Sequence, residues 1–328
     1  MAGFTGRTAE LRKLNDLVTA AQTTGESGVI VLSGGPGVGK SALAVHLGHT
    51  LARRFPDGQL HLDLHGFAHA ARPMSPAAAL RHLLAALGAA RTGSDDAEQQ
   101  SALYRSLTAR RRLFILLDNA RSVEQVRPLL PGGSSSVIVV TSRYSLAGLA
   151  VRDGARRVTL DVMQEEEAIS LFSRIVGQPF TAREYPVVRN VVAACARLPL
   201  ALRIAAARIN SAPSPKVAMA EFTECNLFGN LDVPGDEETS LRSVFDWSYR
   251  ALPADAAQLF RALGTGAGAE LTLQDAAELI EAGPRLVRHA MNTLVDANLV
   301  HEPLPDHFRM NTLVFAYARQ LDSVGHFF

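Results

Sequence analysis

The sequence has little cysteine and no long apolar run. Its 328 residues include only Cys195 and Cys225, which are distant from each other and belong to no CxxC or Cys/His cluster. We therefore expect free buried thiols rather than a disulfide or a metal site. No apolar run approaches the ~20 residues that span a bilayer, and the N-terminus has no apolar signal core. These absences predict a cytoplasmic protein with no membrane partner.

The chain also lacks an excess of charge of either sign. It has 33 lysines and arginines against 32 aspartates and glutamates, so its formal net charge of +1 supplies no global attraction for nucleic acid or anionic lipid. Lysine itself is scarce, occurring only as Lys13, Lys40 and Lys216. The hydrophobic share of 47% and the length are those of an ordinary soluble globular protein with two or three compact units.

Short apolar runs rich in β-branched residues alternate with helical stretches in the first half of the chain. Strands are predicted at 29–33, 59–64, 113–118, 137–141 and 157–160. Helices are predicted at 41–54, 76–87 and 97–110. Alternating helices and buried strands indicate an α/β domain with a parallel sheet covered on both faces. We assign residues 1–160 to this domain.

After residue 160 the strand pattern stops. Amphipathic helices are predicted at 164–176, 182–196 and 200–209, so residues 161–227 are interpreted as a small helical domain. The stretch 228–236 is rich in turn formers and predicts a linker. Residues 236–328 have the outline of a winged-helix domain, with helices at 240–251, 254–263, 273–282 and 284–297, strands at 299–301 and 308–310, and a last helix.

The first strand leads directly into a complete Walker A phosphate loop. The loop reads Gly34-Gly35-Pro36-Gly37-Val38-Gly39-Lys40-Ser41, and Ala42 continues into the helix. Its glycines let successive backbone N–H groups curl around an anion at the positive end of that helix. Lys40 is expected to reach the β- and γ-phosphates, and the Ser41 hydroxyl to ligate Mg²⁺. The sequence therefore predicts binding of a nucleoside triphosphate with magnesium.

A second apolar strand delivers a carboxylate. The run 113–117 ends in Asp118, which fits a Walker B strand, and we expect Asp118 to hold the metal together with Ser41. The next residue is Asn119, where many ATPases of this type have a second acid that activates water. An amide orients water but cannot take its proton, which predicts slow hydrolysis suited to a timer or switch.

A third strand end carries a cation. The strand predicted at 137–141 leads to Arg143, near the edge of the sheet where ligands lie in open α/β folds. Arg143 is therefore a candidate sensor of the γ-phosphate, and it joins Lys40, Asp118 and Asn119 as a catalytic candidate. An ordinary surface arginine remains the alternative interpretation.

In their order, these motifs resemble the NB-ARC nucleotide-binding module of the signal transduction ATPases with numerous domains, the STAND class. They resemble in particular the ATPase part of the large Streptomyces antibiotic regulatory protein family of transcriptional activators. The resemblance covers nearly the whole chain. Besides the Walker A loop it is carried by Phe-Thr-Gly-Arg at 4–7, His-Leu-Asp-Leu-His-Gly at 61–66, Leu-Asp-Asn-Ala at 117–120, Thr-Ser-Arg at 141–143, Arg-Leu-Pro-Leu-Ala-Leu at 197–202 and Val-Phe-Asp-Trp-Ser-Tyr at 244–249. Several of these segments are weak alone, but the ordered set is highly specific.

The resemblance implies that an adenine nucleotide, ATP or ADP, joins two domains. Phe4, Gly6 and Arg7 would border the adenine pocket, and Pro199 of the helical domain would pack on the base or ribose. Pro199 is also a residue that starts a helix, since its missing N–H costs nothing in the first turn, and this structural interpretation stays open.

In this class the winged-helix domain usually supplies a Met-His-Asp motif whose histidine holds the β-phosphate of ADP. The matching residues here are Met310, Asn311 and Thr312. Asn311 keeps a hydrogen-bond donor for a phosphate but cannot become cationic, and Thr312 has no carboxylate. We therefore expect a weaker ADP lock than usual, with less binding energy separating the closed and open states.

The expected function is an ATP/ADP switch in a transcriptional regulator. ADP would hold the domains together, and exchange for ATP would release them for self-association. We expect the family's DNA-binding activator domain and sensor repeats to be absent from this chain. Direct DNA binding through Arg285, Arg288, His289 and Asn292 is not expected, because the winged-helix unit lacks a basic stripe.

Two other functions remain open at this stage. One is a conventional P-loop motor ATPase, which rapid turnover would favour. The other is a winged-helix DNA-binding repressor that uses the nucleotide as a structural cofactor, which steeply salt-dependent duplex binding would favour.

Overall fold

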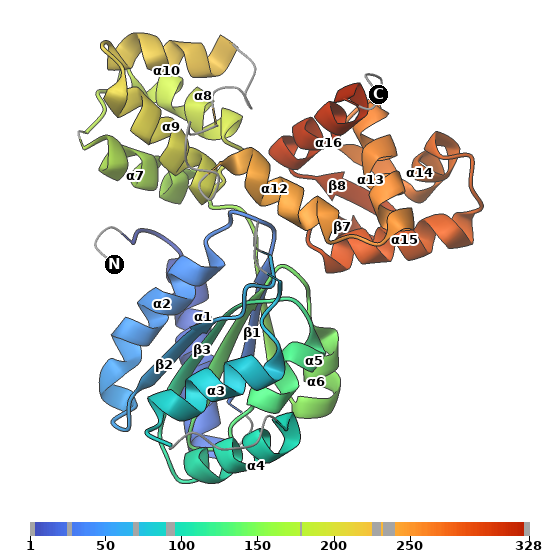
Figure 1. Ribbon diagram of the computed structural model, residues 1–328. Helices are drawn as coiled ribbons and strands as arrows, with labels where there is room; N and C mark the ends of the chain where they lie inside the picture. The colour runs from blue at the N-terminus through green and yellow to red at the C-terminus, as the bar shows by residue number, and fades with distance from the viewer. Residues whose placement is uncertain are drawn as a thin grey trace. The chain divides into compact units, whose positions relative to one another are not determined.

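The computed structural model describes residues 4–24, 28–67, 72–89, 96–177, 179–224, 231 and 240–324. The chain divides into two compact units, both drawn in Figure 1. The first contains the residues up to Gly34 together with Gly39–Leu160, and the second contains Gly35–Val38 and the residues from Asp161 onward. Among the helices within these described ranges, none is long and apolar enough to cross a membrane.

The first unit is built on a five-stranded parallel sheet in the order β2-β3-β4-β1-β5. Its strands are β1 (Val29–Gly34), β2 (Gln59–Asp63), β3 (Phe114–Ala120), β4 (Val137–Ser142) and β5 (Arg156–Leu160). The three central strands are buried along nearly their whole length, as expected for strands covered on both faces. The predicted α/β fold with a parallel sheet is confirmed.

Helices cover both faces of this sheet, with α3 in front of the strands in the view of Figure 1. They are α1 (Thr8–Thr24), α2 (Lys40–Leu51), α3 (Pro76–Ala86), α4 (Ala97–Thr108), α5 (Val123–Val126) and α6 (Ala147–Asp153), with single 3-10 turns η1 (Ala52–Arg54) and η2 (Arg127–Leu129). Leu80 of α3 and Tyr104 of α4 share a buried cluster with Ile115 of β3. On the opposite face α2 packs so closely that a Cβ on Gly48 would lie 2.9 Å from the ring of Phe114.

The second unit is mainly helical. Its helices are α7 (Glu165–Val176), α8 (Tyr185–Ala194), α9 (Pro199–Ser211), α10 (Pro215–Glu224), α12 (Leu241–Arg250), α13 (Ala254–Thr265), α14 (Leu273–Leu279), α15 (Pro284–Asp296) and α16 (Thr312–Val324). A small antiparallel sheet contains β6 (Glu270–Thr272), β7 (Val300–Leu304) and β8 (His307–Met310) in the order β6-β8-β7. Asp306, with φ of 62°, lies in the tight turn between β7 and β8.

The structure differs from the sequence expectations at short or weakly patterned elements. The helix expected at 182–196 begins at Tyr185, because residues 182–184 form a turn. Strand β6 was not expected, since three residues are too few to show a strand alternation. Of the expected linker at 228–236, Leu231 is described and is buried, while the rest lies outside the described residues.

Candidate nucleotide-binding site

The phosphate loop connects the buried strand β1 to helix α2. Gly34, Gly37 and Gly39 have φ angles of 151°, 76° and 92°, which L side chains rarely adopt, so the backbone path itself requires glycine there. Helix α2 begins at Lys40 with Gly39 as its N-cap residue. The first N–H groups of an α-helix have no acceptor within the helix, and they lie at the positive end of its dipole. The start of α2, which includes Ser41 and Ala42, is therefore suited to bind an anion.

The remaining loop residues complete the turn between strand and helix. Gly35, Pro36 and Val38 lie in the middle of the loop, and Pro36 and Val38 are buried. A buried loop with glycine at its strained positions presents backbone rather than side chains to a ligand.

The side chain of Lys40 reaches back to the start of the phosphate loop. Its Nζ donates a hydrogen bond to the carbonyl oxygen of Gly34 at 2.8 Å. Burial and the positive charge of Arg143 lower the pKa of Lys40 to about 7, while the carboxylate of Asp118 opposes this shift. Lys40 is thus held in a place where its own charge is disfavoured until an anion is added.

Asp118 lies near the end of β3, and one of its carboxylate oxygens accepts hydrogen bonds from two hydroxyl groups. Ser41 Oγ donates to Oδ1 of Asp118 at 2.8 Å, and Thr141 Oγ1 donates a short hydrogen bond to the same atom. The arrangement follows from the strand order, because β4 lies between β1 and β3 and places Thr141 beside Asp118. In the sequence, Thr141 stands out only as part of the Thr-Ser-Arg motif at 141–143. A polar residue that follows an apolar run in a buried strand is the feature that could have indicated its role.

Asn119, with φ of 58°, follows Asp118 within β3, where the register between β3 and β4 shifts. Its backbone N–H donates to Thr141 Oγ1 at 2.9 Å, and its carbonyl oxygen accepts from the N–H of Gly66 at 2.8 Å. The residue is therefore fixed through its backbone from two neighbouring strand ends.

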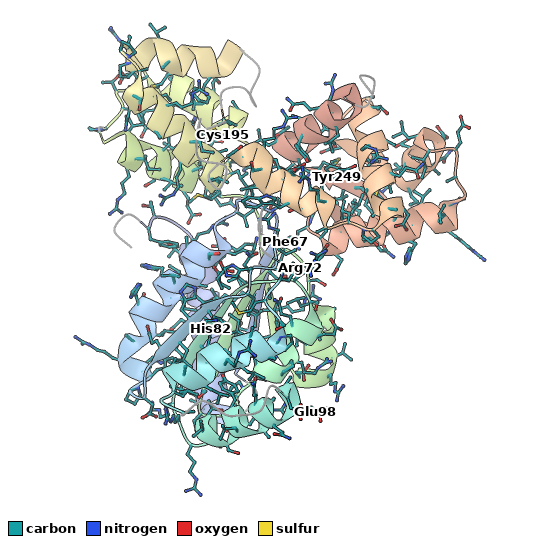
Figure 2. The ribbon with its side chains drawn as sticks, in the orientation of Figure 1. Phe67, Arg72, His82, Glu98, Cys195 and Tyr249 are labelled. Atoms are coloured by element: carbon teal, nitrogen blue, oxygen red, sulfur yellow. The ribbon has the colours of Figure 1, made fainter. Side chains whose placement is uncertain are left out.

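Arg143 follows β4 and belongs to the same group of charges. Burial lowers the pKa of Arg143 to about 10, and its Cζ lies 4.8 Å from the centre of the Phe67 ring, labelled in Figure 2. Because its charge acts on Lys40, the structure brings these two cations together. A partly buried guanidinium that lies over an aromatic ring differs from an ordinary surface arginine.

The N-terminal candidates lie in the first unit. The Phe4 ring is stacked on His46 of α2, with ring centres 4.2 Å apart and planes 8° apart. Gly6 and Arg7 have positive φ angles of 75° and 61°, and the Arg7 guanidinium pairs with Glu10 at 2.7 Å. Phe4 thus contacts the helix that begins at the phosphate loop, while the charge of Arg7 is compensated within the protein.

Pro199 and Asn311 belong to the second unit, whereas Lys40, Ser41 and Asp118 belong to the first. Pro199 is the first residue of α9, the position where proline costs no hydrogen bond. The side-chain oxygen of Asn311 accepts from the N–H of Leu313 at 2.9 Å and so caps α16. Both residues therefore have local structural roles.

The segment 61–66 contains residues to which the sequence assigned no role. Asp63 ends β2 and is the register partner of Asp118 on β3. His65 donates its backbone N–H to Oδ1 of Asp63 at 2.7 Å, and its ring Nδ1 lies 3.4 Å from the same oxygen. An aspartate and a histidine therefore lie at the strand end beside the Walker B carboxylate.

The donors present fit a nucleoside triphosphate with magnesium. Lys40 and Arg143 are two cations that an anionic ligand between or beside them would stabilise. Ser41 and Asp118 supply hydroxyl and carboxylate oxygens, which Mg²⁺ binds together with phosphate oxygens and water.

Comparison with known proteins places an ATPase domain in this chain. Residues 3–178 match the AAA ATPase domain family. The regulatory protein AfsR of Streptomyces coelicolor (strain ATCC BAA-471 / A3(2) / M145) is 39% identical over 324 residues, which are 97% of this chain and 32% of that protein. AfsR of Streptomyces griseus is 39% identical over 317 residues, 96% of this chain and 32% of that protein. The chain therefore spans about a third of the length of these relatives.

A solved structure supports the fold. A Walker-type ATPase of Pyrococcus abyssi superposes with a TM-score of 0.63 at 12% identity, covering 97% of this chain and 96% of that one. The similarity to AfsR confirms the resemblance to the ATPase part of Streptomyces regulatory proteins. Because the family match covers more than half of its residues, the chain belongs to the AAA ATPase domain family.

Proposed function

We propose that this chain is the nucleotide-operated switch module of a transcriptional regulator, binding ATP with Mg²⁺, hydrolysing it slowly and retaining ADP. The observation that carries the proposal is the hydrogen-bonded group of Ser41, Asp118 and Thr141 next to two cations, with an amide at position 119. The first part of this arrangement binds a triphosphate and a metal. The amide limits how fast the triphosphate is cleaved.

Each residue of the loop has a role in this proposal. The backbone from Gly34 to Ala42 surrounds the phosphates, and Lys40 exchanges its hydrogen bond with Gly34 for one with a phosphate oxygen. Ser41 and Asp118 hold the magnesium, which when bound neutralises phosphate charge. Arg143 senses the γ-phosphate from the end of β4, supported by its contact with Phe67.

The adenine end of the nucleotide is proposed to lie near Phe4, Gly6 and Arg7. Support comes from the stacking of Phe4 on His46 of α2, which keeps this segment beside the helix that follows the loop. Arg7 would have to exchange its pairing with Glu10 to contact the base directly. We therefore assign the contact with the base to Phe4 and to the backbone of Gly6.

The finer division of the chain follows the NB-ARC arrangement. We infer that α7–α10 correspond to the helical domain at 161–227 and that α12–α16 with the small sheet correspond to the winged-helix domain at 236–328. The succession of α13, α14, α15 and the β7–β8 hairpin supports the second assignment. Pro199 and Asn311 would supply the contacts to nucleotide from these domains. Because the oxygen of Asn311 caps α16, only its amide N–H groups would serve a phosphate, which supports a weak ADP lock.

Exchange of ADP for ATP is proposed to release the domains for self-association in the cytoplasm, with DNA-binding and sensor domains outside this chain. Similarity to a third of AfsR, a regulatory protein, supports this assignment. Direct DNA binding by α15 is disfavoured, because Arg288 is paired with Glu302 at 2.8 Å and with Asp306 and lies over the Phe308 ring.

The test is the identity of the nucleotide that co-purifies with the protein, determined by chromatography after denaturation. Trapped ADP and turnover below about one per second are expected for a switch. Protein free of nucleotide that also fails to bind added ADP would contradict the proposal. Turnover well above that rate would indicate a motor, and tight salt-dependent duplex binding would indicate a repressor.

A further inference from the structure

The proposed hydrolysis leaves the proton of the attacking water without an acceptor at position 119. An asparagine amide is not a base at neutral pH, so a protein group that accepts this proton has to be a different residue. The segment 61–66, directly beside β3, carries an aspartate and a histidine that have no role in the proposed nucleotide site.

Register places Asp63 on the same face of the sheet as Asp118. The two are partners in the parallel pair β2–β3, where neighbouring strands lie about 4.8 Å apart and partner side chains point to one face. That face is the one covered by α2, because Gln59, four residues before Asp63 on β2, donates from Nε2 to the carbonyl oxygen of Gly48 at 2.6 Å. Leu60 and Leu62 instead pack against the buried cluster on the other face. Asp63 therefore faces the side of the sheet on which α2, with Lys40 and Ser41, begins.

The loop after β2 is attached to the end of β3. Leu64 donates its N–H to the carbonyl oxygen of Asp118 at 2.9 Å, and Gly66 donates to that of Asn119 at 2.8 Å. The same loop is held by Gln125, whose buried side-chain amide donates a hydrogen bond to the carbonyl oxygen of Leu64 at 2.9 Å. His65 lies between these anchored residues, with φ of 52°, so its position relative to Asn119 is set by the backbone.

Asp63 and His65 have the arrangement of an oriented base. Oδ1 of Asp63 accepts the backbone N–H of His65 and lies 3.4 Å from its Nδ1, which favours the tautomer with the proton on Nδ1. Nε2 is then the ring atom able to accept a proton. The side chains of His65 and Asp63 are 43% and 46% exposed, so water reaches both of them.

We propose that His65, oriented by Asp63, is the general base of ATP hydrolysis in this chain. The inference rests on the proposed function. The water oxygen forms a bond to the γ-phosphorus while the bond from that phosphorus to the bridging oxygen breaks, and the bridging electron pair stays with ADP. The proton leaves the water for Nε2 of His65 and passes from there to solvent, leaving ADP and inorganic phosphate.

The first test is single-turnover hydrolysis of ATP with Mg²⁺. His65→Gln is expected to lower the rate about 100-fold, within the range of general-base catalysis, and Asp63→Asn about 10-fold, because the base remains but is no longer oriented. Asp63→Glu should recover part of the rate. His61→Gln is the matched control, since His61 lies on the same strand and the same face as Asp63, two residues earlier, and it should retain the parent rate. A His65→Gln rate equal to that of the parent overturns the inference.

The second test measures the tautomer of His65 without any turnover. Nitrogen-15 NMR of the protein at pH 8 should show His65 protonated on Nδ1, with its signal identified among those of the 10 histidines by its loss in His65→Gln. Asp63→Asn should shift the population toward the other tautomer. A resonance showing the proton on Nε2 in the parent overturns the inference whatever the hydrolysis rates of the variants.

Nucleotide affinity separates this inference from the function on which it rests. The His65 and Asp63 variants should bind a fluorescent ADP as tightly as the parent does. If the parent itself binds no nucleotide, the proposed function fails. If binding is intact and hydrolysis does not depend on His65, only the assignment of the base fails.

Discussion

Gly66 contacts the backbone of Asn119 so closely that no side chain fits between them. Its N–H donates to the carbonyl oxygen of Asn119 at 2.8 Å, and a Cβ on Gly66 would lie 2.4 Å from that same oxygen. The loop after β2 and the end of β3 after the Walker B aspartate therefore pack directly against each other. Displacing either segment displaces the other.

Gly66→Ala is expected to destabilise the protein by about 1–3 kcal/mol, because the added methyl group meets backbone that cannot rotate away. Chemical denaturation measures this change. Gly268→Ala is the matched control, since a Cβ there meets nothing within 4 Å, and it should change the stability by less than about 0.5 kcal/mol. Equal stabilities for the two variants would show that the loop does not pack on Asn119 as described.

Asp118→Asn should remove the magnesium dependence of nucleotide binding. The variant keeps an acceptor for the hydroxyls of Ser41 and Thr141 but loses the charge that attracts the metal. We expect ATP affinity measured with Mg²⁺ to fall about tenfold or more, toward the value measured in EDTA. Asp16→Asn, on the exposed surface of α1, should leave the magnesium dependence unchanged.

The stability of the metal-free and nucleotide-free protein should rise with pH in a window set by Lys40. Its pKa is lowered in the fold to about 7 from the ordinary value of 10.5, so between these values the unfolded chain holds a proton that the folded chain lacks. Stability therefore increases as pH rises through this window, by up to about 1.4 kcal/mol per pH unit. Below pH 7 the cost of the buried charge is present in full.

Denaturant titrations from pH 7 to 9.5 in EDTA test this dependence. The difference between the parent and Lys40→Met isolates the contribution of Lys40 from other titrating groups. Arg143→Met should raise the pKa of Lys40 in the folded protein, because the charge of Arg143 is one cause of its lowered pKa. The rise in stability should then begin at a higher pH. A Lys40→Met variant with the same pH profile as the parent would contradict the assignment.

Cys195 should be chemically silent in the native protein. It is fully buried at the end of α8, labelled in Figure 2, and burial raises the pKa of its thiol to about 12. In a Cys225→Ser variant, a chromogenic disulfide reagent at pH 8 should detect no thiol until denaturant is added, because the reactive form is the thiolate. If the folded variant releases about one equivalent of chromophore per protein chain, the thiol at the end of α8 is accessible to solvent.

The phosphate loop and Asp118 could be located from the sequence because each motif is local. A glycine-rich loop between an apolar strand and a helix, and an apolar strand that ends in an acid, are visible within ten residues. The partnership of Thr141 and Asp63 with Asp118 could not be predicted in this way. It depends on which strands are neighbours in the sheet, and hydrophobic periodicity carries no information about strand order.

The other candidates show a second limit. The resemblance makes Asn311 a candidate ligand for phosphate. Its side chain also caps α16, through a hydrogen bond to a residue only two positions further along the chain. The same applies to Pro199 at the start of α9. Residues that satisfy the backbone and residues that satisfy a ligand are chemically the same types, so sequence alone does not separate them.

The position of β4 between β1 and β3 has a consequence for the order of folding. The phosphate loop is complete at Ser41 and the carboxylate at Asp118, but they become parts of one sheet only when residues 137–142 insert between their strands. A nascent chain that stops before Val137 contains both motifs but lacks the strand that joins β1 and β3 into one sheet. The ability to retain a nucleotide should therefore arise in a single step once residues 137–142 have been synthesised, and not gradually as each motif leaves the ribosome.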